Sequence, residues 1–63
     1  MALDVKALSI FRDAEIARQK LAKSMLDGFA ANAFEKPAAA EDIAYWEAEL
    51  ADATAELAAM DHA

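Results

Sequence analysis

The side chains that could carry out chemistry in this chain are few and far apart in the sequence. There is no cysteine, one histidine (His62), and two serines (Ser9 and Ser24) with no base at the spacing of a catalytic motif. His62 beside Asp61 does not make a zinc site, because zinc needs three or four converging ligands. We therefore expect no catalytic residue, no cofactor, no metal site and no enzymatic activity.

The length of the chain limits the hydrophobic core that it can build. A chain of 63 residues forms one domain at most, and cores of this size rarely supply more than about 3–5 kcal/mol of stability. Small proteins usually compensate with disulfides, metals or oligomerisation, and the lack of cysteine removes the first of these. We therefore expect the chain to associate with its own copies or to dock on a larger protein.

The composition predicts an all-α fold. Alanine, which has the highest helix propensity, fills 19 positions, and there is one glycine and one proline. The strong break is at Pro37, because proline fits the first position of a helix but disfavours helical geometry in the residue before it. We therefore expect Pro37 to open the second helix. We predict an antiparallel hairpin of two helices, completed to a bundle by oligomerisation or by a partner. The first helix spans about 4–33 with Asp4 as its N-cap, the turn about 34–38, and the second helix about 38–61.

Gly28 leaves two courses open for the first helix. The helix could stop at Asp27-Gly28, with Phe29 packing back on the last turn. Alternatively, it continues into the alanine-rich segment that follows, at a cost of about 1 kcal/mol for the glycine. We favour continuation.

The second helix has the most regular hydrophobic pattern. Its apolar residues alternate between spacings of four and three, which predicts a heptad seam against another helix. The seam contains Ala39, Ile43, Trp46, Leu50, Ala53, Leu57 and Met60, with Leu50 and Leu57 as core residues. The opposite face is predicted to hold Tyr45, Glu49, Asp52 and Glu56.

The first helix has two apolar rows. The first row contains Leu3, Ala7, Ile10, Ala14, Ala17 and Leu21. The second row contains Leu8, Phe11, Ala22, Met25 and Phe29. Together the rows are wider than one partner helix needs, so one row should pack on the second helix and the other on another chain. We expect the second row to contact the other chain.

Arg18 interrupts the second row between Phe11 and Met25. An unpaired buried charge is costly, so its guanidinium would need a carboxylate from Glu15, from the second helix or from another chain. Alternatively, only the aliphatic stem packs and the charged end reaches solvent. We favour this second interpretation.

Charge is unevenly divided between the two predicted helices. Residues 1–34 hold five basic and four acidic residues, a balance of +1, whereas residues 38–63 hold seven acidic residues and no lysine or arginine, a balance of −7. Glu35 and Lys36 cancel, so the chain carries −6. We interpret the acidic helix as a solvated face, with a docking surface for a basic protein as the alternative. Direct nucleic-acid binding is not expected, because the basic residues form no stripe and the net charge opposes phosphate.

The sequence also bears on location. No stretch of 18 residues is free of charge, so we expect no membrane span. The first residues include Asp4 and no apolar block, which is unlike a secretory signal. We expect a cytoplasmic protein or a virion component.

These observations predict a small structural or assembly protein that acts through helix–helix contacts between proteins, as a homo-oligomer or as a subunit of a larger complex or virion. The alternative is an acidic inhibitor or adaptor of phage or plasmid type that binds a basic protein through the second helix. The candidate interface residues are Leu8, Phe11, Arg18, Met25, Phe29, Tyr45, Glu49, Asp52 and Glu56. We expect Phe11→Glu or Met25→Glu to disrupt assembly.

Overall fold

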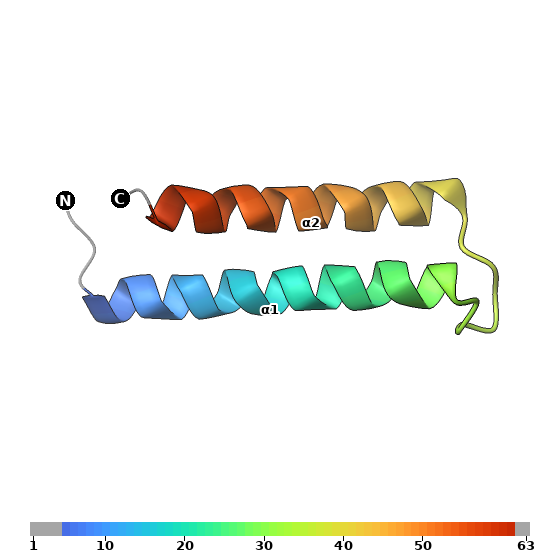
Figure 1. Cartoon of the computed structure of the whole chain (residues 1–63), viewed down its shortest axis with the longest axis horizontal. Coiled ribbons are helices and arrows are strands. Elements are labelled where there is room, and N and C mark those ends of the chain that lie inside the picture. The colour runs from blue at the N-terminus through green and yellow to red at the C-terminus, as the bar shows by residue number, and fades with distance from the viewer. Residues whose placement is uncertain (1–4, 62–63) are drawn as a thin grey trace.

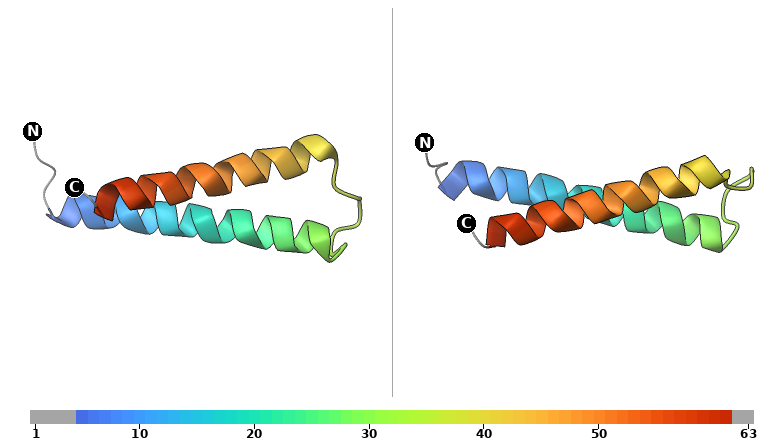
Figure 2. Two further views of the ribbon diagram at one scale, coloured as in Figure 1. Left: turned by 45° about the horizontal axis from the view of Figure 1, so that its top comes forward. Right: turned by 90° about the horizontal axis from the view of Figure 1, so that it is seen from above.

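Two helices make up the fold of the described residues and run antiparallel (Figure 1). The computed structural model describes residues 5–61, so Leu3, Asp4 and His62 lie outside the described residues. Helix α1 spans Val5–Ala30 and helix α2 spans Ala40–Asp61. The two helices run side by side and cross at a shallow angle (Figure 2) in a rod of 46 × 16 × 14 Å. The predicted all-α helical hairpin is confirmed.

Helix α1 continues through Gly28, as predicted, and ends at Ala30 in a Schellman motif. Asn32 takes the left-handed conformation, with φ of 54°. The N–H of Ala33 donates to the carbonyl of Gly28 at 2.9 Å, and the N–H of Asn32 donates to the carbonyl of Phe29 at 3.2 Å. Because these bonds satisfy carbonyls at the helix end, Asn32 stops α1 three residues before the predicted end at 33.

Gly28 makes room for the aromatic ring of Phe34. A Cβ atom on Gly28 would lie 2.6 Å from Cε2 of Phe34, well inside van der Waals contact. The Phe34 ring also packs edge-on against Phe29, with centroids 5.2 Å apart. The glycine therefore lets the connection fold back over the last turn of α1.

Helix α2 begins at Ala40, two residues later than predicted. Pro37 lies in the connection, so the prediction that it opens the second helix is wrong. Ala39 is the N-cap, because its carbonyl accepts from the N–H groups of Asp42 at 3.0 Å and Ile43 at 3.2 Å. The Asp42 carboxylate accepts in return from the N–H of Ala39 at 3.3 Å. This reciprocal bond is one half of a capping box and fixes the start of α2.

The core between the helices is thin. Its centre is formed by Ala22 of α1 and Ala53 of α2, the fully buried residues of the described chain. The central seam residues of α2 are half-buried beside them: Trp46, Leu50, Leu57 and Met60. The predicted seam is confirmed there, whereas Ala39 and Ile43 at its start are exposed. No large side chain among the described residues is fully buried, so the contact buries little apolar area.

The apolar row of α1 that faces α2 is the second row. Ala22 is buried, Leu8, Met25 and Phe29 are half-buried, and Phe11 is 50% exposed. The described residues that remain exposed in the first row are Ile10, Ala14, Ala17 and Leu21, called the free row below. Helix α2 of the same chain therefore covers most of the second row, which was expected to contact another chain, while contact of the exposed Phe11 with another chain stays a prediction.

Candidate interaction surface

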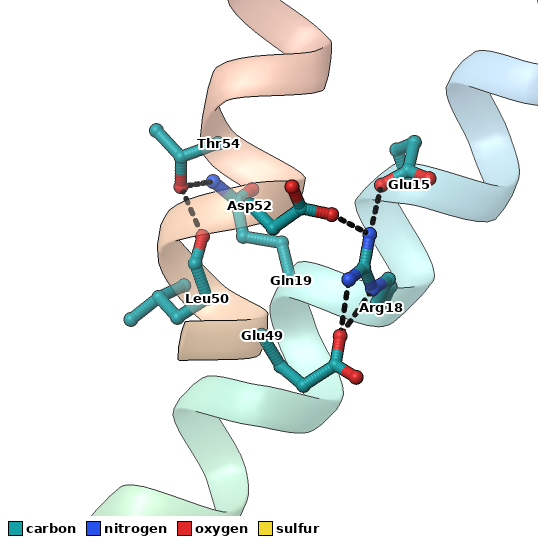
Figure 3. Close-up of polar contacts among 7 residues, drawn as sticks. All are labelled: Glu15, Arg18, Gln19, Glu49, Leu50, Asp52 and Thr54. Atoms are coloured by element: carbon teal, nitrogen blue, oxygen red, sulfur yellow. Dashed lines mark hydrogen bonds and ion pairs between the residues drawn. The ribbon is translucent and has the colours of Figure 1, made fainter. Parts of the chain in front are cut away.

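Arg18 lies at the centre of a cluster of carboxylates from both helices (Figure 3). Its Nε donates to Oε2 of Glu49 at 2.5 Å, and its Nη2 pairs with the same oxygen. Its Nη1 pairs with Asp52 of α2 at 2.8 Å and with Glu15 of α1 at 3.2 Å. The guanidinium thus pairs with carboxylates of both helices, as the alternative interpretation required, although the Arg18 side chain also keeps part of its surface exposed to solvent.

The Arg18 cluster lies at the edge of the helix contact. The side chain of Arg18 is 34% exposed and that of Asp52 is 58% exposed. Hydrogen bonds to Glu49 and then to Asp52 raise the pKa of Arg18. Because water screens ion pairs at such an edge, we assign the cluster a positioning role. The planar guanidinium fixes how α2 is rotated and shifted along α1.

Tyr45 extends this cluster along α2. Its ring packs edge-on against Trp46, with centroids 5.0 Å apart, and remains 56% exposed. The Glu49 carboxylate raises the pKa of the Tyr45 hydroxyl, through hydrogen bonding first and through its negative charge second. A shallow depression is lined by Arg18, Tyr45, Ala48, Glu49 and Asp52. Glu49 and Asp52 thus reach the helix contact, and their predicted place on the opposite face is wrong.

The titration of Tyr45 tests this arrangement, because the chain contains one tyrosine. We expect its phenol to ionise above the ordinary pKa of about 10, and Glu49→Gln to bring that pKa back towards the ordinary value. Since the fold favours the neutral phenol, this contact stabilises the hairpin fully below about pH 10 and is lost as the pH rises through the raised pKa.

Ultraviolet absorbance of the phenolate measures this pKa directly. Glu56→Gln is the matched control, because it removes an equal charge from a more distant position on α2. An ordinary pKa in the native chain, or the same raised pKa in Glu49→Gln, would contradict the contact between Tyr45 and Glu49.

Two polar contacts outside this cluster also tie the helices together. Nη2 of Arg12 pairs with Asp61 at 3.0 Å. Nε2 of Gln19 donates to Oγ1 of Thr54 at 3.1 Å, and Thr54 donates to the carbonyl of Leu50 at 2.8 Å. Neither contact was predicted, because each depends on the relative register of the helices, which the pattern of a single helix does not contain.

The nine candidate interface residues fall into three groups. Leu8, Met25 and Phe29 are half-buried in the contact with α2. Arg18, Tyr45, Glu49 and Asp52 form the cluster described above. Phe11 and Glu56 are exposed. The structure therefore uses most of these residues inside the hairpin.

The free row is an exposed apolar surface whose residues were not among the nine candidate interface residues. Ile10 is 61% exposed and Leu21 is 53% exposed, with Ala14 and Ala17 between them. Their spacing of four, three and four residues places all four on one side of α1. The double row in the sequence was the signal for this surface, and the choice between the rows required the position of α2.

The acidic residues of α2 serve mainly to build the hairpin. Of the seven carboxylates of α2, four contact α1 or cap the helix: Asp42, Glu49, Asp52 and Asp61. Within residues 5–61, Glu41, Glu47 and Glu56 make no ion pair or capping bond. The acidic surface available to a partner is therefore smaller than the charge of −7 suggests.

Between residues 5 and 61, no group of three or more histidine, aspartate or glutamate side chains is placed to hold a metal ion. Neither α1 nor α2 is long and apolar enough to cross a membrane. Comparisons with known protein families, curated proteins and solved structures find no match to this chain.

Proposed function

We propose that this chain is a non-enzymatic structural or assembly protein that acts through helix–helix contacts with other protein chains. The observation that carries the proposal is the imbalance between its buried and exposed apolar residues. Ala22 and Ala53 are the buried residues of the described chain, whereas Ile10 and Leu21 are more than half exposed. An apolar surface of this kind is typical of a binding site.

The total exposed area supports the same proposal. The chain exposes 4905 Å², whereas a compact monomer of its mass exposes about 4,000 Å². The excess of about 900 Å² is close to the roughly 800 Å² that each partner contributes to a standard interface. Covering the free row and its surroundings would therefore bring the exposed area to that of a compact protein.

The alternative, an acidic adaptor that binds a basic protein through α2, has less support. Most carboxylates of α2 already act within the hairpin, and the three others are Glu41, Glu47 and Glu56. The two functions differ in their response to salt, because charge-based docking weakens with ionic strength whereas apolar packing changes little.

Sedimentation velocity at micromolar concentration tests the proposal. We expect the native chain to sediment as a dimer or larger species. The double variant Ile10→Ser with Leu21→Ser should sediment as a monomer, because it removes the large apolar side chains of the free row.

Val5→Ser is the control, since Val5 is 85% exposed and lies outside the free row, and it should leave the assembly unchanged. Circular dichroism of each variant checks that the helices persist. A native chain that stays monomeric and melts cooperatively would contradict the proposal.

A further inference from the structure

We infer that the partner of the free row is a second copy of this chain, with the two α1 helices packed antiparallel about a two-fold axis. This inference rests on the proposed function and names its partner. The free row reads the same in both directions: a large residue, two alanines and a large residue, at spacings of four, three and four. All four residues are exposed.

A two-fold contact requires a surface that is complementary to itself. If the axis lies level with the midpoint between Ala14 and Ala17, each of these alanines faces the other alanine of the second copy. Ile10 of each copy then lies level with Leu21 of its partner. The alanines allow a close approach of the two backbones at the centre, and the large side chains close both ends of the contact.

The charged residues beside the free row are also complementary in the antiparallel pair. Asp13 and Lys20 precede Ala14 and Leu21, so they share the flank of the row that points away from α2. In the antiparallel pair, Asp13 of one copy and Lys20 of the other lie on the same side of the contact. They are offset by two residues along the axis, about 3 Å at the helical rise. Both are exposed, and neither makes an ion pair with residues 5–61 of its own chain.

The orientation follows from these charges. A parallel pair in register would place the two copies of Asp13 on opposite sides of the contact, and the two copies of Lys20 likewise, so these charges would gain no partner of opposite sign. The antiparallel pair instead forms two equivalent contacts between opposite charges, which set the direction and register of association.

The two-fold axis also places both α2 helices on one side of the α1 pair, which gives four helices. The edges of α2 that carry Asp52 and Glu56 then face each other across the dimer. Salt screens both this like-charge contact and the Asp13–Lys20 contacts, whose effects on association are opposite, so association should depend little on ionic strength. Docking of an acidic helix on a basic protein would instead weaken as the ionic strength rises.

Disulfide cross-linking between introduced cysteines tests the geometry, because the native chain contains no cysteine. Ile10→Cys and Leu21→Cys are prepared separately, mixed and oxidised. We expect a covalent dimer that contains one chain of each variant. Each variant alone should cross-link poorly. In the antiparallel pair the two copies of position 10 are eleven residues apart along the axis, about 16 Å, whereas a disulfide needs Cα atoms within about 7 Å.

The matched control mixes Ser9→Cys with Lys23→Cys, two exposed positions of α1 well outside the free row, and should give no cross-link. Efficient cross-linking of Ile10→Cys with itself would show a parallel pair, and would overturn the inference while the proposed function stands. A chain that associates in sedimentation but forms no cross-link between positions 10 and 21 would show that another surface is used. That result would also overturn the inference and leave the proposed function standing. A native chain that sediments as a monomer would contradict both the inference and the proposed function.

Discussion

Ala53→Leu should strongly destabilise the hairpin, although it replaces one helix-forming apolar residue by another. Ala53 has no exposed surface, and neither does Ala22 on the facing helix. A larger side chain at this position forces the helices apart, and overpacking of this kind typically costs about 1–3 kcal/mol. This is a large share of the roughly 3–5 kcal/mol that a core of this size supplies.

Urea denaturation followed by circular dichroism measures this loss. Ala55→Leu is the matched control, because it makes the same substitution at an exposed position of the same helix. We expect its free energy of unfolding to stay close to that of the native chain. An Ala53→Leu chain as stable as the Ala55→Leu chain would show that the helices do not approach closely at Ala53.

Leu50→Ala should also destabilise the hairpin, for the opposite reason. Leu50 is half-buried in the seam of α2 that faces α1. Truncating a fully buried leucine costs about 2–5 kcal/mol, so a half-buried one should cost about 1–3 kcal/mol. The loss should appear as a lower midpoint of thermal melting.

Val5→Ala provides the comparison for this variant, because the Val5 side chain is 85% exposed and contributes little to the contact. An unchanged melting midpoint in Leu50→Ala would mean that Leu50 lies on a solvent-facing side of α2.

The sequence was sufficient to predict the hairpin itself. The alternation of four and three in α2, which includes Trp46, Leu50 and Leu57, identified the face that packs, and the alanine-rich composition predicted two helices. The two helix ends at the connection were displaced, by three residues in α1 and by two in α2. Hydrogen bonds of Asn32 and Asp42 set those ends, and several nearby residues could have provided equivalent caps.

The candidate site was less predictable, because the periodicity of a helix defines its faces but not which faces of two helices meet. Arg18 was recognised as an exception in an apolar row, yet its partners Glu49 and Asp52 were assigned to the wrong face of α2. For the same reason, the row of α1 that was predicted to contact another chain is the row that packs on α2. Both errors have one physical cause, since the rotation of each helix about its own axis depends on contacts between side chains that are distant in sequence.

The dependence of thermal stability on protein concentration tests the central claim that association completes this hairpin. Because mass action favours a folded state that contains more than one chain, we predict a melting midpoint that rises steadily from low micromolar to near-millimolar concentration. The Ile10→Ser, Leu21→Ser double variant should lose that dependence. A sharp, cooperative melt of the native chain with the same midpoint at every concentration would show that the two helices are stable alone, and would contradict the account.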